Sequence, residues 1–141
     1  MFDVFTPDVL QALWRGTQIT LGLTALSSAF GLVLGFVAAL GRLSRLWPLR
    51  ALAGSYIEIF RGTPLLVQLF FLFFALPQLT RVTLPPFQTA VLGLSLFAGA
   101  YAAEIIRAGI EATPKGQIEA ALSLAMSRAQ TFSKEIGRAH V

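Results

Sequence analysis

Two acid–base pairs at helical spacing are the residues of this chain best suited to chemistry. Glu58 precedes Arg61 and Glu104 precedes Arg107, each by three positions, so the members of a pair can share one helix face. Both pairs lie within or at the edge of long apolar segments. Ionisable side chains are costly there and usually face a cavity or a partner, which indicates a polar pathway. The alternative is that each pair neutralises itself and orients a helix end.

The sequence offers no catalytic or metal-binding constellation. It contains no glycine-rich phosphate loop with a lysine, so we expect this chain itself to bind no ATP. It has no cysteine, and its one histidine, His140, has no partner for metal binding or for nucleophilic catalysis. We therefore predict a protein that is not an enzyme and that holds no metal or cofactor.

The composition is that of a membrane protein. Of the 141 residues, 55% are hydrophobic and 13% are charged, and the mean hydropathy is +0.71. A soluble domain typically carries about 25% charged residues. The net charge of +4 comes from basic residues at the ends of apolar segments, which indicates membrane topology and not a nucleic-acid-binding face. The sequence thus predicts an all-α integral membrane protein in contact with lipid.

The first predicted span covers residues 16–41, which carry no charge. About 20 apolar residues suffice to cross a bilayer. Before this span, Pro7 and Asp8 have the positions of a helix start, and the apolar residues that follow share one face. We predict a periplasmic segment over residues 1–15, with an interfacial helix at 7–15. Because no basic region precedes it, no cleaved signal peptide is expected.

Small residues recur at every fourth position of this first span. They are Ser27, Gly31, Gly35 and Ala39. On a helix they form one stripe that would let another backbone approach closely. The alternative is that small residues are simply frequent in membrane helices.

The second predicted span, at about residues 55–79, is interrupted. Residues 62–64 read Gly-Thr-Pro, and proline ends or kinks a helix because it lacks an N–H and clashes with the preceding turn. Residues 65–76 form a run of leucine and phenylalanine in which only Gln68 is polar. That run is too short to cross alone, so part of residues 51–61 is expected at membrane depth.

The third predicted span covers about residues 86–108. Its interior is rich in glycine, alanine and serine, which indicates a helix that packs against protein more than lipid. Glu104 falls near the far boundary of the hydrocarbon core. Tyr101 and Gln68 are lesser candidates for a polar pathway, with buried hydrogen bonds between helices as the alternative.

Basic residues are distributed unevenly between the two sides of the membrane. Between spans one and two lie Arg42, Arg45 and Arg50, after span three lie Arg107, Lys115 and Arg128, and the opposite side holds Arg15 and Arg81. Cytoplasmic loops carry the excess of arginine and lysine. This distribution predicts an N-terminus outside the cell and a cytoplasmic segment after span three.

Two segments carry a resemblance to a known family. Residues 114–127 read Pro-Lys-Gly-Gln-Ile-Glu-Ala-Ala-Leu-Ser-Leu-Ala-Met-Ser and follow the third span directly. Residues 57–66 read Ile-Glu-Ile-Phe-Arg-Gly-Thr-Pro-Leu-Leu. With these segments the chain resembles, over residues 1 to about 132, the membrane permease subunit of bacterial ABC importers, in particular the family for polar-amino-acid uptake.

This resemblance implies a fold and a contact with an ATPase. The fold is a type-1 permease bundle of five spans, of which residues 16–132 hold three spans and a cytoplasmic coupling helix within 114–132. In the family this helix docks into the ATP-binding subunit, which here assigns the docking contact to Gly116, Glu119, Ala120, Ala121 and Ala125. The family has glycine at the position of Ala125, which puts the fine geometry of docking in doubt. The alternative is an ordinary amphipathic loop helix.

The resemblance also implies partners, a location and a substrate. The partners are the ABC ATP-binding subunit, which holds the ATP, a periplasmic or lipid-anchored solute-binding protein, and a second permease copy or paralogue. The location is the bacterial inner membrane. The substrate is a zwitterion, whose pathway needs both signs of charge. Candidate pathway residues are Glu58, Arg61, Thr63, Gln68, Tyr101 and Glu104. The alternatives are a permease for another small solute, or a small membrane anchor or assembly protein without transport.

The last nine residues differ from the rest of the chain. The final heptapeptide reads Glu-Ile-Gly-Arg-Ala-His-Val and looks like the translation of a sequencing adapter. We therefore expect residues 133–141 to be a non-native tail and exclude them from the fold. The alternative is a real polar tail. Because three spans do not enclose a pathway, the polypeptide as written is expected to insert into the membrane but not to transport.

Overall fold

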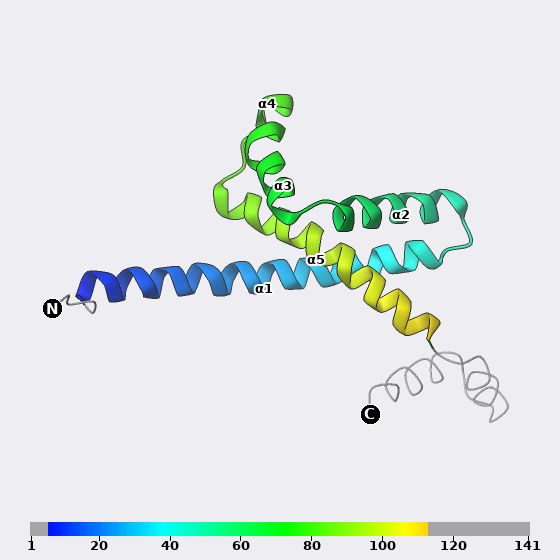
Figure 1. Ribbon diagram of the computed structural model, residues 1–141, viewed down its shortest axis with the longest axis horizontal. Coiled ribbons are helices and arrows are strands. Elements are labelled where there is room, and N and C mark those ends of the chain that lie inside the picture. Colours follow the sequence, from blue (N-terminus) through cyan, green and yellow to red (C-terminus); the bar gives the residue numbers. More distant parts are fainter. Residues whose placement is uncertain (1–5, 113–141) are drawn as a thin grey trace, which may run out of the picture.

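The computed structural model describes residues 6–112, whose regular structure is entirely helical (Figure 1). Helix α1 covers Pro7–Leu43, and α2 runs back beside it over Trp47–Gly62. A second helical stretch consists of α3 (Leu65–Phe70), the π-helix η1 (Phe71–Ala75) and α4 (Leu76–Thr80). Helix α5 covers Pro86–Glu111 and crosses α1.

Helix α1 is continuous through the boundary that the sequence suggested between residues 15 and 16. The separate interfacial helix predicted at 7–15 is the first part of this 37-residue helix, because Gly16 by itself does not break a helix. The start does have the predicted features, with Thr6 as an extended N-cap, Pro7 at the first helical position and Asp8 in the first turn. At 1.5 Å per residue α1 is about 56 Å long, so it exceeds the roughly 30 Å hydrocarbon core.

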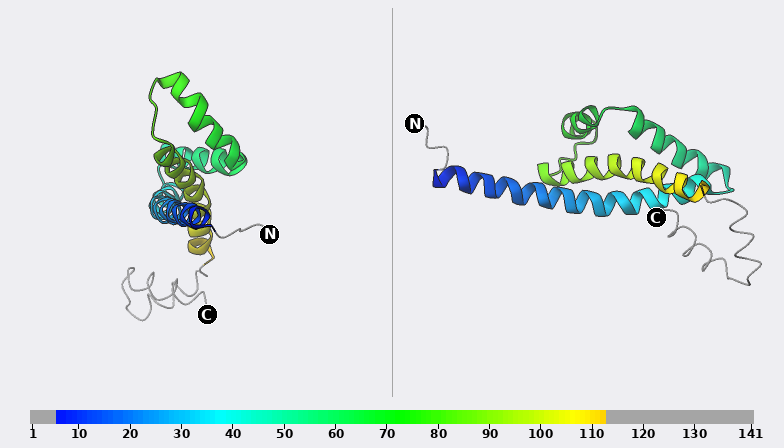
Figure 2. Two further views of the ribbon diagram at one scale, coloured as in Figure 1. Left: turned by 90° about the vertical axis from the view of Figure 1, so that its left-hand side faces the viewer. Right: turned by 60° about the horizontal axis from the view of Figure 1, so that its bottom comes forward.

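The predicted break in the second span is present. Thr63 is extended (φ −113°, ψ 139°), as expected for a residue before proline, and it ends α2 at Gly62. The helix pair on either side of the break is bent by 105°, and Figure 2 shows the α3–α4 stretch turned away from α2. Helix α2 begins at Trp47, upstream of the span start expected near residue 55, because Pro48 favours a helix start there.

The π-helical turn in the second half of this span has a local cause. Pro77 has no N–H to donate to the carbonyl four residues before it. The turn widens just before this proline, and the backbone N–H of Leu76 donates to the carbonyl of Phe71, five residues earlier. The stretch ends at Arg81, which adopts a left-handed conformation (φ 60°) and whose N–H donates to the carbonyl of Pro77.

Helices α1 and α5 form the most extensive contact in the described part of the chain. The buried residues of α1 are the four predicted ones: Ser27, Gly31, Gly35 and Ala39. A Cβ built on Gly35 would lie 2.6 Å from the Cβ of Ala102 and 2.9 Å from the carbonyl oxygen of Gly99. The two backbones thus approach as closely as glycine allows.

A second close approach holds α2 against α5. The hydroxyl of Tyr56 donates to the carbonyl oxygen of Leu96 at 2.7 Å. A Cβ built on Gly99 of α5 would lie 2.7 Å from this hydroxyl and 3.1 Å from the carbonyl oxygen of Gly31 on α1. The three helices α1, α2 and α5 therefore converge at Gly99. A small core of Ala39, Ile57 and Ala103 lies beside this point.

Two helices in the described residues, α1 and α5, are long and apolar enough to cross a membrane, and a third span results if the bent pair is counted as one. This agrees with the predicted set of three spans. The third span, expected at about 86–108, corresponds to Pro86–Glu111. Most large apolar side chains of the described region are exposed, as in a protein whose outer surface faces lipid.

Candidate functional site

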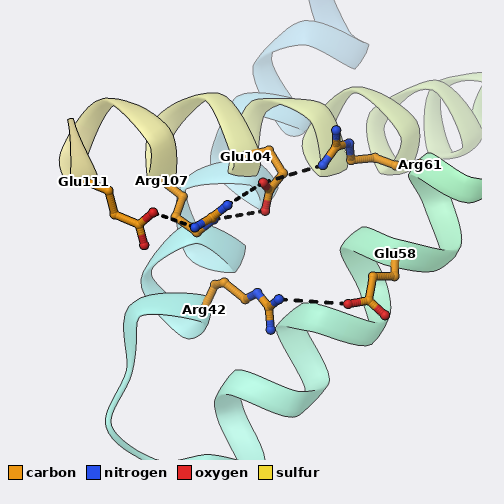
Figure 3. Close-up of polar contacts among 6 residues, drawn as sticks. All are labelled: Arg42, Glu58, Arg61, Glu104, Arg107 and Glu111. Atoms are coloured by element: carbon orange, nitrogen blue, oxygen red, sulfur yellow. Dashed lines mark hydrogen bonds and ion pairs between the residues drawn. The ribbon is translucent and has the colours of Figure 1, made fainter.

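Six charged side chains from three helices gather where α1, α2 and α5 come together (Figure 3). We call this set the ionic cluster; it consists of Arg42 on α1, Glu58 and Arg61 on α2, and Glu104, Arg107 and Glu111 on α5. It contains three arginines and three glutamates, so the formal charges cancel. Such a cluster presents both signs of charge beside apolar helices.

Glu104 is the centre of the cluster. Its Oε1 accepts a hydrogen bond from Nε of Arg107 at 3.1 Å, and its Oε2 accepts one from Nη2 of the same residue at 2.9 Å. The Nη1 of Arg107 also donates to Oε2 of Glu111 at 2.6 Å. A two-point arginine–carboxylate contact fixes both groups more firmly than a single contact. The predicted Glu104–Arg107 pair is thus present.

Glu58 and Arg61 do not form the ion pair that their spacing predicted. The Oε1 of Glu58 lies 3.9 Å from Nη2 of Arg42, on α1. Nη1 of Arg61 lies 3.5 Å from Oε2 of Glu104, on α5. The physical reason is tertiary: the neighbouring helices bring partners closer than the three-residue spacing along α2 does. Both contacts are long and partly exposed, so they contribute little stability by themselves.

Arg61 also lies over an aromatic ring. Its guanidinium carbon is 5.4 Å from the ring centroid of Tyr101, within the range of a cation–π contact. The Tyr101 ring is itself 4.8 Å from that of Phe97. The Arg61 side chain is 43% exposed and that of Glu104 is 22% exposed. Three predicted pathway residues, Arg61, Tyr101 and Glu104, therefore meet on one accessible face.

Thr63 and Gln68, two other predicted pathway residues, meet at the bend. Because Pro64 has no N–H, the carbonyl of Phe60 loses its helical partner. The Nε2 of Gln68 takes that place at 2.9 Å, and it also lies 2.9 Å from the carbonyl and 2.8 Å from the hydroxyl of Thr63. The Thr63 hydroxyl donates to the carbonyl of Ile59 at 2.8 Å. Both side chains thus stabilise the bend.

A cavity of about 330 Å³ lies at this bend. Its lining is mostly apolar: Ile59, Phe60, Val67, Phe71 and Leu72, with Thr63 and Gln68 as the polar members. The Oε1 of Gln68 is buried and has no hydrogen-bond partner within the described residues. The geometry is that of the helix-packing alternative for Gln68, in which its Nε2 donates to backbone carbonyls at the bend.

Several residues of the cluster and its surroundings were not predicted. Arg42 was interpreted only as a topology signal, and Glu111 and Tyr56 were not considered. Gly54 leaves room for Arg42: a Cβ there would lie 2.6 Å from Nη1 of Arg42. Tyr56 had a usable signal, since a tyrosine within an apolar helix usually needs a partner for its hydroxyl.

The predicted docking residues lie outside the described residues. This holds for Gly116, Glu119, Ala120, Ala121 and Ala125, and also for the tail at 133–141. The described chain ends on α5 one turn after Arg107, at the end of the molecule where the ionic cluster lies (Figures 1 and 3). The segment predicted to dock, residues 114–132, therefore follows the cluster directly in sequence.

Comparison with known proteins decides the family. Residues 31–140 match the family described as binding-protein-dependent transport system inner membrane component. The chain belongs to this family. The resemblance to ABC permeases is thereby confirmed, and so is the all-α membrane fold with two to three apolar spans.

The similar proteins are amino-acid permeases. The L-cystine transport system permease protein TcyB of Bacillus subtilis is 46% identical over 132 residues, which are 91% of this chain and 56% of that protein. The putative glutamine transport system permease protein GlnP of Rickettsia bellii is 44% identical over 88% of this chain and 56% of its own length. The arginine transport system permease protein ArtQ of Bacillus subtilis is 46% identical over 78% of this chain and 50% of its own.

A solved structure shows the same fold. It is described as the crystal structure of an amino acid ABC transporter with histidines, and the chain matches it with a TM-score of 0.72 and 40% identity. The match covers 91% of this chain and 62% of that one. The chain thus spans about half the length of the relatives that it matches and somewhat more of the solved chain.

Proposed function

We propose that this chain is part of the membrane-spanning subunit of an ATP-driven importer for polar amino acids. The observation that carries the proposal is the match over residues 31–140 to inner membrane transport components, together with relatives that are each named for an amino acid. ATP is bound and hydrolysed on a separate ATP-binding subunit. A periplasmic or lipid-anchored solute-binding protein delivers the substrate, and a second permease copy or paralogue completes the pathway.

The face formed by Arg61, Tyr101 and Glu104 is the proposed part of the pathway. A polar amino acid carries a carboxylate and an ammonium group, and both lose water on entering a membrane. Arg61 has a 3.5 Å contact to Glu104 and is 43% exposed, so its guanidinium can exchange that contact for a substrate carboxylate. Glu104 is held in place by its two-point contact with Arg107, and its carboxylate can accept the ammonium group.

Glu58, Thr63 and Gln68 extend this proposed pathway along α2 and past the bend. Glu58 is 76% exposed on the side of α2 that faces Arg42. Thr63 and Gln68 hold the start of α3 against the end of α2, directly after Arg61. The proposed role of Thr63 and Gln68 is therefore to shape the pathway next to Arg61.

The segment 114–132 is proposed to dock the ATPase. Gly116, Glu119, Ala120, Ala121 and Ala125 form the docking contact, in which the small side chains permit close approach and Glu119 meets a basic or amide-lined groove. The test uses a chimera in which residues 1–132 replace the matching segment of full-length TcyB. This protein is called the chimera below.

In the chimera, Glu119→Lys is expected to abolish copurification of the ATPase while the amount of protein in the membrane stays unchanged. The reason is that the substitution reverses the charge of a group that faces a complementary groove. Copurification on affinity resin measures it, and Gln117→Lys is the control for added positive charge in the same segment. Unchanged copurification together with unchanged uptake would remove the assignment of this segment to ATPase coupling.

The proposed orientation places the N-terminus in the periplasm and the docking segment in the cytoplasm. It rests on the uneven distribution of arginine and lysine. Because the chain has no cysteine, single cysteines can report each side. Phe5→Cys is expected to react with an impermeant thiol reagent in intact cells, whereas Gln117→Cys reacts only after lysis. The reverse pattern would overturn the orientation.

A further inference from the structure

The turn between α1 and α2 exposes an unpaired cationic and aromatic patch. Arg45 and Arg50 are exposed, and in the part of the chain that the structure describes neither lies within ion-pairing distance of a carboxylate. This distinguishes them from the arginines of the ionic cluster, all of which have carboxylate partners. Within residues 6–112, no carboxylate therefore neutralises their charge by an ion pair.

Apolar side chains stand beside these two arginines. Trp47 is 71% exposed and Leu46 is 62% exposed, although both are large and hydrophobic. They lie between Arg45 and Arg50 in the sequence, at the turn and the start of α2. An exposed tryptophan next to arginine is the composition of a protein surface at the membrane–water interface.

The sequence position places this turn at the depth of lipid headgroups. The uncharged stretch of α1 ends at Gly41, and α1 itself ends at Leu43. Arg45 therefore follows the hydrocarbon boundary by about one helical turn. At this depth a guanidinium can reach the phosphate layer while its methylene groups stay on apolar surface.

We infer that the α1–α2 turn binds the headgroup of an anionic phospholipid, with Arg45 and Arg50 contacting the phosphate and Trp47 lying along the acyl chain. Charge complementarity selects an anionic lipid over a zwitterionic one, because the latter carries a compensating cation. Basic residues at a membrane surface favour anionic lipid by a factor of roughly five each. The inference does not depend on which side of the membrane the turn faces.

Tryptophan fluorescence tests this site directly. The sequence contains two tryptophans, so a Trp14→Phe background leaves Trp47 as the only reporter. The full chain is placed in vesicles that mix phosphatidylcholine with phosphatidylglycerol, and bromine is carried on the chains of one lipid or the other. Brominated phosphatidylglycerol is expected to quench Trp47 several-fold more strongly than brominated phosphatidylcholine at the same mole fraction.

Two controls separate a specific site from general attraction. Arg45→Gln combined with Arg50→Gln is expected to remove the preference, whereas Arg15→Gln, at the other end of the uncharged stretch, leaves it unchanged. When Arg45 and Arg50 are both retained, about 1 M salt is also expected to reduce the preference for phosphatidylglycerol, because the Debye length falls to roughly 3 Å. Equal quenching by the two lipids would overturn the inference and assign the patch to a protein partner. A preference that survives both the double substitution and high salt would overturn it as well.

Discussion

Replacing Gly35 with leucine is expected to lower the thermal unfolding midpoint of the protein by more than about 10 °C. Even one added carbon would lie 2.6 Å from the Cβ of Ala102 and 2.9 Å from the carbonyl oxygen of Gly99. Since part of this obstacle is backbone, a change of rotamer does not relieve it, and α1 must move away from α5. Overpacking of this kind costs about 3 kcal/mol. Unfolding of the detergent-solubilised chain, followed by size-exclusion chromatography after heating, measures the midpoint.

Gly16→Leu is the matched control on the same helix. A Cβ on Gly16 meets no atom within 4 Å. Both substitutions raise the helix propensity of α1 by the same amount, so the difference between them isolates the contact with α5. Equal midpoints for the two variants would show that α1 and α5 do not approach as closely as the structure has them.

Replacing Arg61 with alanine in the chimera is expected to lower the rate of substrate uptake about tenfold, which corresponds to roughly 1.4 kcal/mol. This is the size of one hydrogen bond to a charged group. The substitution removes the guanidinium that lies 3.5 Å from Glu104 and over the ring of Tyr101. Uptake of radiolabelled substrate, normalised to the amount of chimera in the membrane, measures the effect.

Two variants separate a pathway role from a structural one. Arg61→Lys keeps the positive charge but not the planar fork, and is expected to retain more uptake than Arg61→Ala. Arg15→Ala, at an exposed position near the start of α1 and far from the ionic cluster, is expected to leave uptake unchanged. If Arg61→Ala reduces protein level and uptake in equal proportion, the residue serves the stability of the α2–α5 contact and not the pathway.

The spans, the bend after Gly62 and the packing face of α1 follow from local patterns in the sequence. Residues 16–41 carry no charge, proline at position 64 forces Thr63 out of the helix, and small residues recur at every fourth position of α1. These are local effects of backbone geometry and hydropathy. For that reason the bent second span and the buried face of α1 could be anticipated. The continuity of α1 through residue 16 could not, because a single glycine is compatible both with a helix boundary and with a continuous helix.

The partners in the ionic cluster could not be predicted in the same way. Spacing along one helix pairs Glu58 with Arg61, but the crossing of three helices pairs Glu58 with Arg42 and Arg61 with Glu104. The first contact joins residues that are 16 positions apart in the sequence, and the second joins residues that are 43 positions apart. Only the contacts of Arg107 with Glu104 and with Glu111 are local, and the first of them is the pair that the spacing identified. Tyr56 and Gly99 belong to the same class, because their contact exists only once α2 lies on α5.

The geometry links helix packing to the proposed transport function. The close approach of α2 to α5, at Gly99 and at the hydrogen bond from Tyr56 to Leu96, brings Arg61 within 3.5 Å of Glu104. The two-point contact with Arg107 holds Glu104, whereas Arg61 has a looser contact that a substrate carboxylate can replace. The proposed pathway face is thus rigid on the side of α5 and exchangeable on the side of α2.

Uptake by the chimera itself tests the proposed function most directly. The chimera is reconstituted in proteoliposomes with the ATP-binding subunit and the solute-binding protein of the same transport system, and labelled L-cystine and other polar amino acids are supplied outside. We expect accumulation that requires ATP on the side of the ATP-binding subunit and requires the solute-binding protein. A chimera that reaches the membrane at the normal level and binds the ATPase, yet accumulates none of these amino acids, would contradict the assignment of this chain to an amino-acid importer.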